Sequence, residues 1–316
     1  MEKVYRWGIL GAGNIAHRFA RSLKSEKRSV LYAIAGRNRE KLERFQQEFP
    51  CEVIYDDYDA FLNDENIDVV YLALPHGLHC PWAVKTLKKG KAVLCEKPAT
   101  VSAAEMAEIE RVHQETGVFF MEAMKGRFTP AYRQLKKDIG TIGEIIRLDT
   151  SISFKVDLNT ARKEYMFDPR QGGGLLDNGI YCASWYEDLI GERPQIAKTV
   201  IDRFNGGIDI YVRADLQFSR AGGTLESALD RAEPKNAVIT GTKGEITVYD
   251  LHRPQRYRLR TVDRDEEVFV PYEVDDFYSQ IAHVIDCLEN GKKESDIMPL
   301  RASRYCAELL EAIRNH

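Results

Sequence analysis

Short apolar runs alternate with amphipathic segments over the first 123 residues. The apolar runs are typical of strands buried on both faces of a sheet, and the segments between them repeat apolar residues at helical spacing. The expected strands are residues 4–10, 30–35, 51–55, 67–74, 92–95 and 118–121, and the expected helices are residues 16–23, 57–62, 80–88 and 103–116. This order predicts an α/β domain with a doubly wound parallel sheet.

The pattern changes to an alternation of period two after residue 123. Residues 146–156 and 208–218 alternate apolar and polar side chains, as expected of antiparallel strands with one buried face. Further strands are expected at 223–229, 237–240, 245–249 and 257–262, a turn at 241–244, and helices at 275–289 and 299–314. The sequence thus predicts a domain of residues 1–123 and an α/β domain of residues 124–316 with a large, mostly antiparallel open sheet. The polar face of that sheet is either solvated or covered by another subunit.

A glycine-rich turn joins the first expected strand to the first helix. The stretch Gly11-Ala12-Gly13-Asn14-Ile15-Ala16 fits the pattern G-x-G-x-x-A. Gly11 permits a tight turn, Gly13 lets the backbone approach a pyrophosphate, and Ala16 keeps the helix close to the sheet. The N–H groups at the start of the helix favour a phosphate. The turn predicts a dinucleotide site, although the nucleotide site of methyltransferases has a similar pattern.

The end of the second expected strand distinguishes NADP from NAD. NAD-binding folds place an Asp or Glu about 20 residues beyond the glycines, on the ribose 2′-hydroxyl. Here Gly36-Arg37-Asn38-Arg39 stands at that position, with no carboxylate before Glu40. The planar guanidinium of an arginine suits a 2′-phosphate, although solvated arginines are also common at strand ends. We therefore expect NADP rather than NAD, with Gly36 and Arg37 at the cofactor.

Two further stretches follow strand ends, where doubly wound sheets bind their ligands. In Cys95-Glu96-Lys97-Pro98, the lysine precedes a proline that stiffens the loop. A lysine held there can hydrogen-bond a substrate hydroxyl and stabilise the alkoxide formed on hydride loss, whereas the alternative is a surface lysine. In the stretch 74–79, His76 and His79 either line a nicotinamide pocket or serve helix entry and packing. The residues expected at the cofactor from both stretches are Leu74, Pro75, His76, His79, Glu96 and Lys97.

Three glycines, Gly172-Gly173-Gly174, lead into an expected helix that runs to about residue 190 in the second domain. Asp177 and Tyr181 are four residues apart, so an α-helix would place both on one face. A carboxylate and a phenol on one face can reach into a cleft. The alternative is an Asp that favours the helix dipole and a Tyr that packs in the core.

Composition excludes several classes of protein. A net charge of −4 and a pI near 6.0 argue against nucleic acid or an anionic membrane as a partner. No apolar run approaches the roughly 20 residues of a membrane span, and the chain starts without a signal-peptide pattern. The six cysteines are scattered without a C-x-x-C pair, which argues against a metal site and a disulfide framework. We expect a cytoplasmic protein with reduced thiols.

Taken together, these motifs resemble the glucose-fructose oxidoreductase/inositol dehydrogenase (Gfo/Idh/MocA) family, and within it the branch of NADP-dependent dihydrodiol and D-xylose dehydrogenases. The resemblance spans nearly the whole chain. It rests on the glycine turn, Glu96-Lys97-Pro98, the stretch 172–181, Met121-Glu122-Ala123, Arg127-Phe128-Thr129-Pro130, Asp168-Pro169 and Gly241-Thr242-Lys243-Gly244. Many members carry a histidine where this chain has Tyr181, and the branch often has an arginine at Tyr165.

The resemblance implies a Rossmann domain, a second α/β domain and an active site between them. It implies hydride transfer between NADP and a CH–OH group of a sugar, cyclitol or trans-dihydrodiol, in a homodimer or homotetramer. Lys97, Asp177 and Tyr181 are then catalytic. Tyr181 is the acid/base, its pKa lowered from about 10 by the Lys97 ammonium, and Asp177 holds a substrate hydroxyl. The expected cofactor contacts at the turn are Gly11, Ala12, Gly13, Asn14 and Ile15.

Two other functions are compatible with the fold class. A non-catalytic nucleotide-binding sensor or regulator would need no lysine in the Glu-Lys-Pro motif, so Lys97 disfavours it. A methyltransferase would leave Arg37 and Lys97 without a role.

Overall fold

The structure, a computed structural model, describes residues 3–158 and 165–316, and these divide into two compact units. The first comprises residues up to 100, 104–123 and 273–300. The second comprises residues 101–103, 124–272 and 301–316. Apart from residues 101–103, the second unit is therefore the domain expected from residue 124 onward without residues 273–300, which belong to the first unit.

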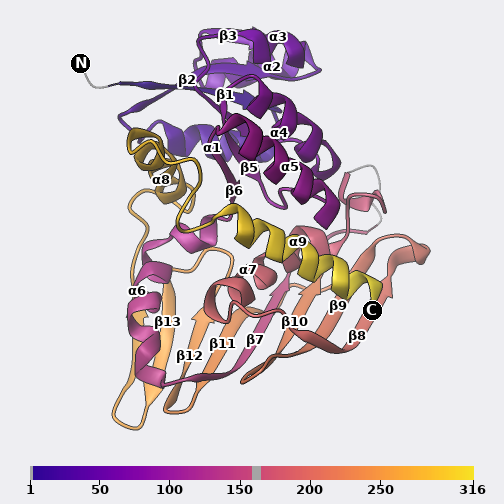
Figure 1. The fold of residues 1–316 in the computed structure, drawn as a ribbon, viewed down its shortest axis with the longest axis vertical. Helices are drawn as coiled ribbons and strands as arrows, with labels where there is room; N and C mark the ends of the chain where they lie inside the picture. The colour runs from indigo at the N-terminus through magenta and orange to yellow at the C-terminus, as the bar shows by residue number, and fades with distance from the viewer. Residues whose placement is uncertain (1–2, 159–164) are drawn as a thin grey trace. The chain divides into compact units, whose positions relative to one another are not determined.

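The first unit is built on a six-stranded parallel sheet in the order β3-β2-β1-β4-β5-β6 (Figure 1). Every residue of β4 and β5 is buried, which explains their nearly continuous apolar sequence. The strands are β1 (Tyr5–Leu10), β2 (Ser29–Ala35), β3 (Val53–Tyr55), β4 (Val69–Leu72), β5 (Ala92–Glu96) and β6 (Phe120–Ala123). From β1 the chain first adds β2 and β3 on one side of the sheet and then adds β4, β5 and β6 on the other side. The order of the strands thus reverses between β1 and β4, and in this fold ligands bind in the crevice beyond the carboxyl ends of these two strands.

Helices complete the first unit. They are α1 (Asn14–Leu23), α2 (Arg39–Glu48), α3 (Tyr58–Asn63), α4 (His79–Lys88), α5 (Ala103–Thr116) and α8 (Tyr278–Glu289). Ala16, Phe19 and Leu23 are buried on α1, as the helical spacing predicts. The segment directly before α8 is fastened to α1: Arg18 pairs with Asp276 at 2.7 Å, and Ser22 donates to Asp275 at 2.8 Å.

The second unit contains an eight-stranded sheet in the order β14-β13-β12-β11-β7-β10-β9-β8 (Figure 1). Among the described strand pairs of this second sheet, only β7–β10 is parallel, and β10 forms an antiparallel hairpin with β9. The strands are β7 (Ile145–Ser153), β8 (Gln195–Arg203), β9 (Asp209–Gln217), β10 (Gly222–Ala228), β11 (Lys235–Gly241), β12 (Gly244–Tyr249), β13 (Arg256–Thr261) and β14 (Asp265–Phe269). The predicted fold class, a doubly wound parallel sheet and a mostly antiparallel open sheet, is confirmed.

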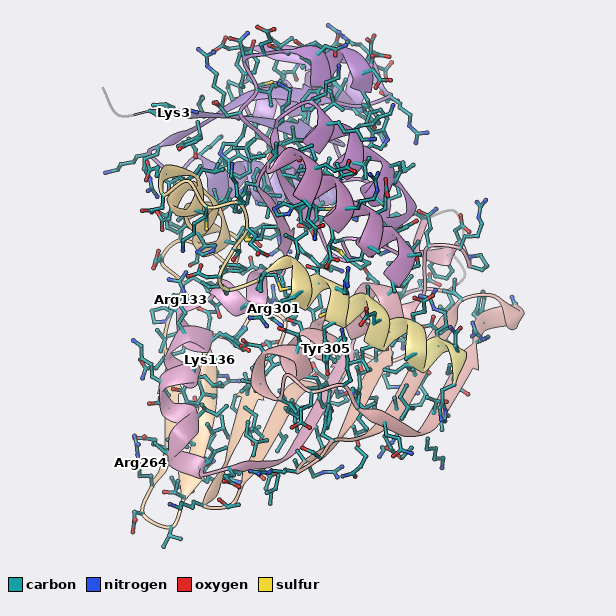
Figure 2. All side chains as sticks on the ribbon, viewed as in Figure 1. Lys3, Arg133, Lys136, Arg264, Arg301 and Tyr305 are labelled. Carbon is teal, nitrogen blue, oxygen red and sulfur yellow. The ribbon has the colours of Figure 1, made fainter. Side chains whose placement is uncertain are left out.

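The helices of the second unit are α6 (Pro130–Asp138), α7 (Ile180–Leu189) and α9 (Leu300–Asn315), and α7 packs on β7 and β10. Figure 2 labels Arg301 and Tyr305 on α9. The Tyr305 hydroxyl donates to the carbonyl of Glu192 at 2.7 Å, and Arg301 lies 3.6 Å from Glu187. The face with alternating polar residues carries ion pairs such as Arg147–Asp149 at 2.6 Å. None of the described helices has the length and hydropathy needed to cross a bilayer.

Candidate functional site

The glycine turn begins directly after β1. Gly11 has φ of +107°, and its N–H donates to the carbonyl of Ala35 at 2.8 Å. A Cβ at Gly11 would lie 2.4 Å from the carbonyl oxygen of Ala73. The turn therefore requires glycine both for its backbone conformation and for its close approach to the segment after β4.

Gly13 is the N-cap of α1 and leaves the start of the helix open. A Cβ built on Gly13 would meet no atom within 4 Å, and the cap supplies no side-chain hydrogen bond. Gly13 and Asn14 are exposed, Ala12 and Ile15 are half-buried, and Ala16 is fully buried against the sheet. The first-turn N–H groups and the positive end of the helix dipole therefore face a space that an anionic group can enter.

The end of β2 separates a buried glycine from an exposed arginine. Gly36 is buried, and its Cβ would lie 3.1 Å from Leu42. Arg37 is exposed, whereas Asn38 uses its side chain to cap α2 by accepting from Lys41 N at 3.0 Å. Of these residues, Arg37 presents the charged group that suits a phosphate.

His79 bridges the segments that follow β4 and β5. Its Nδ1 lies 2.7 Å from the carbonyl oxygen of Pro98, and its Nε2 lies 2.7 Å from that of Leu74. The side chain is completely buried, and burial lowers the pKa of the imidazole although the two carbonyl contacts oppose this shift; the nearby Lys97 charge adds to the lowering. His76 is also buried, 5.8 Å from His79 between ring centres. These contacts give His79 a packing role at the strand ends, one of the two alternatives that the sequence left open.

The loop after β5 is held by buried carboxylates. Glu96 accepts hydrogen bonds from the Tyr71 hydroxyl and, at 3.2 Å, from Lys97 N. The Tyr71 ring stacks on Phe19 of α1 at 3.8 Å between centres. One strand away, Glu122 accepts from Ala99 N at 2.9 Å. The half-buried Lys97 therefore lies in a loop whose backbone is held at Lys97 by Glu96 and at Ala99 by Glu122.

All the residues predicted for the first unit lie at one edge of its sheet. Gly11, Gly36, Leu74 and Glu96 stand at or just after the carboxyl ends of β1, β2, β4 and β5, and the strands are parallel. A shared direction brings these ends to the same edge. The structure therefore gathers the expected cofactor residues and Lys97 where this fold binds nucleotides.

In the second unit the three glycines allow a close backbone approach. A Cβ at Gly172 would lie 2.0 Å from the carbonyl oxygen of Met166, and Gly173 has φ of +103°. After them comes a π-helical turn, η6 (Leu175–Gly179), before α7 begins. The predicted helix after the glycines is present, but its first turn, which carries Asp177, is π-helical rather than α-helical. Half-buried Asp177 lies in this π turn and buried Tyr181 lies near the start of α7, about one helical turn later.

Asp209 holds the start of this turn, and the sequence reasoning missed it. Its carboxylate accepts a hydrogen bond from Leu175 N at 2.6 Å, and a Cβ at Gly173 would lie 2.2 Å from its Oδ1. The residue is buried, and burial raises the pKa of the carboxyl. In the sequence it was one polar position in an alternating strand. Nothing local marks it, because its partner lies 34 residues earlier in the chain.

Arg127 is a second residue whose setting the sequence did not reveal. It is buried, and it donates to Ser184 Oγ at 2.7 Å and pairs with Glu187 at 2.7 Å, both on α7. The Arg-Phe-Thr-Pro motif thus anchors the helix that carries Tyr181. Lys97 belongs to the first unit, and Asp177 and Tyr181 belong to the second.

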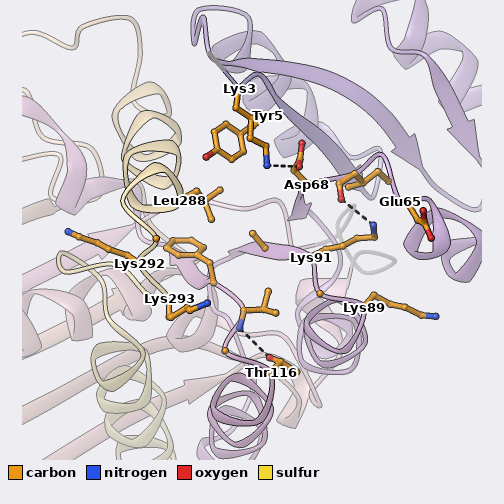
Figure 3. Close-up of a pocket in the computed structure, with 17 residues that line it drawn as sticks. Lys3, Tyr5, Glu65, Asp68, Lys89, Lys91, Thr116, Leu288, Lys292 and Lys293 are labelled. Atoms are coloured by element: carbon orange, nitrogen blue, oxygen red, sulfur yellow. Dashed lines mark hydrogen bonds and ion pairs between the residues drawn. The ribbon is translucent and has the colours of Figure 1, made fainter. Parts of the chain in front are cut away.

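A cavity of about 580 Å³ lies elsewhere on the first unit (Figure 3). Its lining comes from the segments that precede β4, β5 and β6, at the amino-terminal edge of the sheet, together with residues after α8. Lys91 reaches from its wall to the carbonyls of Asp64 and Ile67, at 2.6 and 3.1 Å. Because the glycine turn follows the carboxyl end of β1, this cavity is not the predicted nucleotide site.

Two family models match the chain. The model described as an oxidoreductase family with an NAD-binding Rossmann fold (GFO_IDH_MocA) matches residues 5–124. The model described as the GFO/IDH/MocA C-terminal domain matches residues 132–247. Together they cover both sheets.

Curated relatives match over nearly the full length. The trans-1,2-dihydrobenzene-1,2-diol dehydrogenase of Mus musculus is 35% identical over 335 residues, covering 98% of this chain and 96% of that protein. The Homo sapiens protein of the same name is 30% identical over 341 residues, with the same coverage.

Solved structures share the fold. A 3-ketoreductase from Actinomadura kijaniata, in complex with NADP and TDP-benzene, has a TM-score of 0.88 at 24% identity and covers 99% of this chain and 98% of its own. Levoglucosan dehydrogenase, in complex with NADH and levoglucosan, has a TM-score of 0.89 at 20% identity, covering 99% and 97%.

Proposed function

The chain belongs to the GFO/IDH/MocA oxidoreductase family and is an NAD(P)-dependent oxidoreductase acting on CH–OH groups, and from this premise we propose its preferred cofactor, its substrate class and the roles of its residues. The proposed reaction is hydride transfer between NADP and one hydroxyl-bearing carbon of a small molecule with adjacent hydroxyls. The observation that carries it is the open entrance to α1 at Gly13. A phosphate-bearing cofactor needs such a side-chain-free approach to a helix start.

The residues at the carboxyl edge of the first sheet fit a dinucleotide. Gly11, Ala12, Gly13, Asn14 and Ile15 offer backbone N–H groups to a pyrophosphate, and buried Ala16 keeps those groups close to the sheet. When bound, the nicotinamide supplies or accepts the hydride. Leu74, Pro75, His76, His79 and Glu96 shape the same edge, with His79 and Glu96 acting through the backbone segments that they hold.

Arg37 supports NADP over NAD. Its exposed guanidinium stands where an NAD-specific site has a carboxylate, and the neighbouring Asn38 side chain is engaged in capping α2. In the proposal Arg37 binds the ribose 2′-phosphate through paired N–H groups. The A. kijaniata ketoreductase was solved with NADP, which agrees with this preference, while the NADH complex of levoglucosan dehydrogenase shows that the fold accepts both cofactors.

Lys97, Asp177 and Tyr181 are the proposed catalytic residues. The Lys97 ammonium hydrogen-bonds the reacting hydroxyl and stabilises the negative charge that develops on its oxygen as the hydride leaves. The Tyr181 phenol takes up the hydroxyl proton as the general base, or returns it in the reverse direction. Asp177 accepts a hydrogen bond from the adjacent hydroxyl and orients the substrate. The roles are supported by the fixed loop beneath Lys97 and by the anchoring of η6 and α7 through Asp209 and Arg127.

The proposed substrates are aldoses, cyclitols and trans-dihydrodiols. All present a second hydroxyl next to the reacting one, which is what the Asp177 role requires. Among these we rank the trans-dihydrodiol first, and the support for this order is that the curated relatives are named trans-1,2-dihydrobenzene-1,2-diol dehydrogenases. We further propose a cytoplasmic homodimer or homotetramer. Support for reduced surroundings is that all six cysteines are free thiols.

The test is nicotinamide absorbance at mildly alkaline pH with NADP or NAD against a panel of aldoses, cyclitols and a trans-dihydrodiol. Turnover of one class with NADP preferred is expected. If NADPH binds, as measured by its fluorescence, but no member of the panel reacts, the substrate proposal is wrong while the cofactor site stands. If neither cofactor binds, the assignment of the glycine turn fails. Size-exclusion chromatography with light scattering tests the oligomeric state.

A further inference from the structure

Helix α8 and the segment after it bring together three side chains of metal-binding type. His283 and Cys287 are four residues apart on α8, so both lie on one face, and both are buried. The chain then turns and returns with Ser295 and Asp296 beside them. One ligand atom each of His283, Cys287 and Asp296 lies within 4.8 Å of the others. No metal was expected from the sequence, because the cysteines show no paired spacing and this grouping depends on the return of the chain.

The distances suit a small tetrahedral ion. Cys287 Sγ lies 3.3 Å from His283 Nε2, and that nitrogen lies 3.6 Å from Asp296 Oδ1. Around a tetrahedral Zn²⁺, with bonds of about 2.0 to 2.3 Å, neighbouring ligand atoms lie roughly 3.3 to 3.7 Å apart. The side chains therefore need only small adjustments to surround an ion.

The hydrogen bonds of Ser295 orient the imidazole correctly. Ser295 Oγ accepts from Ile297 N at 3.0 Å and from Met298 N at 2.9 Å, so its two lone pairs are used. Its own hydrogen is then directed to His283 Nε2, 2.8 Å away. Nε2 must accept this bond, so it is the unprotonated nitrogen of the ring, and its single lone pair is the one that an ion would take in place of the Ser295 hydrogen. A metal ion needs that lone pair.

We propose that His283 Nε2, Cys287 Sγ and Asp296 Oδ1 form a binding site for Zn²⁺, with water in the fourth position. A thiolate, an imidazole and one carboxylate favour a borderline-soft ion over Mg²⁺ or Ca²⁺. The site lies in residues 273–300 of the first unit and is independent of the hydride transfer proposed above. It fastens the carboxyl-terminal part of α8 to the segment that follows it.

Ion binding must displace a proton and compete with a lysine. A metal–sulfur bond forms only with the thiolate, so binding at Cys287 releases the thiol proton to water. The charged groups that act on Cys287 are Lys292, Asp286 and Asp296. Lys292 pairs with Asp296 Oδ2 at 3.3 Å and leaves Oδ1 facing His283. The affinity is therefore expected to fall as pH decreases, with one proton released per ion.

Cobalt provides the direct test, because a Co²⁺–thiolate bond has a near-ultraviolet charge-transfer band. The full-length protein, reduced and freed of metals by a chelator, is titrated with Co²⁺ and then with Zn²⁺. The expected result is a stoichiometric complex at micromolar concentration, with the thiolate band and tetrahedral visible bands, both removed by Zn²⁺. Cys287→Ser should abolish the charge-transfer band, whereas the control Cys51→Ser, at a half-buried cysteine in another part of the unit, should keep it.

Asp296→Asn tests the site with a variant that is expected to fold normally, because Asp296 is exposed and its replacement leaves the core intact. It should lower the Zn²⁺ affinity about tenfold or more with an unchanged melting temperature. The proposal is overturned if no stoichiometric complex forms. It is equally overturned if the charge-transfer band survives Cys287→Ser, or if Asp296→Asn binds Zn²⁺ as tightly as the parent protein.

Discussion

Asp209 of β9 accepts a 2.6 Å hydrogen bond from the backbone N–H of Leu175, the first residue of the π turn that carries Asp177. The contact joins two segments distant in sequence, and it satisfies a buried donor at the start of a helix. The position of the proposed substrate-binding carboxylate thus depends on a carboxylate that has no direct part in the reaction.

Replacing Asp209 should separate positioning from folding. Asp209→Ala leaves the Leu175 N–H unsatisfied, and we expect a loss of about 1 to 2 kcal/mol of stability. We also expect kcat to fall more than cofactor affinity, because the change disturbs η6. Asp209→Asn keeps an oxygen acceptor and should recover most of both. Thermal unfolding and steady-state kinetics of the two variants check this. If Asp209→Ala and Asp209→Asn have equal kcat values, Asp209 has no positioning role.

Gly13→Ala should weaken cofactor binding without affecting the fold. A Cβ at Gly13 meets nothing within 4 Å in the protein and occupies only the space proposed for the pyrophosphate. We expect NADPH affinity to fall about tenfold or more, since each 1.4 kcal/mol is tenfold in Kd, with an unchanged melting temperature. Gly140→Ala is the matched control, because its Cβ also meets nothing and it lies in the second unit. Fluorescence titration measures both, and unaltered NADPH binding by Gly13→Ala would contradict the site.

Arg37→Ala should change the preference between cofactors. Losing charge-assisted hydrogen bonds to a phosphate costs about 1.5 to 3 kcal/mol, or roughly 10- to 100-fold in affinity. This loss should affect NADPH and leave NADH nearly unchanged. Arg44→Ala removes an equally exposed charge from α2 and should alter neither. If Arg37→Ala loses NADPH affinity and NADH affinity to the same extent, Arg37 does not bind the 2′-phosphate.

Lys97→Met and Tyr181→Phe should impair chemistry rather than cofactor binding. Removing a positioned acid, base or electrostatic stabiliser commonly costs about 10²- to 10⁴-fold in rate. Both variants are expected to bind NADPH normally and to lose kcat on that scale. Tyr249→Phe, at a half-buried tyrosine of β12, serves as the control. Near-normal turnover by Tyr181→Phe would assign the proton transfer to another group.

His79 should make stability depend on pH. Burial lowers the pKa of its imidazole, so below the ordinary value of about 6.5 the unfolded chain takes up a proton that the folded protein does not. The stability from neutral, buried His79 is present above that pH and is lost as pH falls toward the lowered pKa. The difference in unfolding free energy between the parent protein and His79→Gln should therefore shrink from pH 7.5 to pH 5.5. A difference independent of pH would show that His79 keeps its ordinary pKa.

The sequence predicted the elements whose signals are local. The glycine turn, the buried face of α1 and the runs that became β4 and β5 each follow from a short pattern of apolar residues. Helix α2 was missed because charged residues dominate it and few positions are buried, and β8 was missed because six of its nine residues are exposed.

The remaining features depend on residues far apart in the chain. The π turn at Asp177 follows from the tight approach of Gly172 to Met166 and from the cap by Asp209, neither of which has a local pattern. His79 bridges the segments after β4 and β5 because these strands are neighbours in the sheet, and the sequence around His79 does not show this pairing. Candidate residues were thus predictable from position, while the contacts that hold them were not.

The attachment of α8 to α1 has a consequence for how the protein is made. The guanidinium of Arg18 lies 4.7 Å from the Phe277 ring centre and Ser22 donates to Asp275, a residue that is made 253 positions later in the chain. Throughout the translation of the second sheet, the nascent first sheet lacks the helix that covers this side of α1. That side of α1 therefore stays uncovered until residues 275–277 have been made.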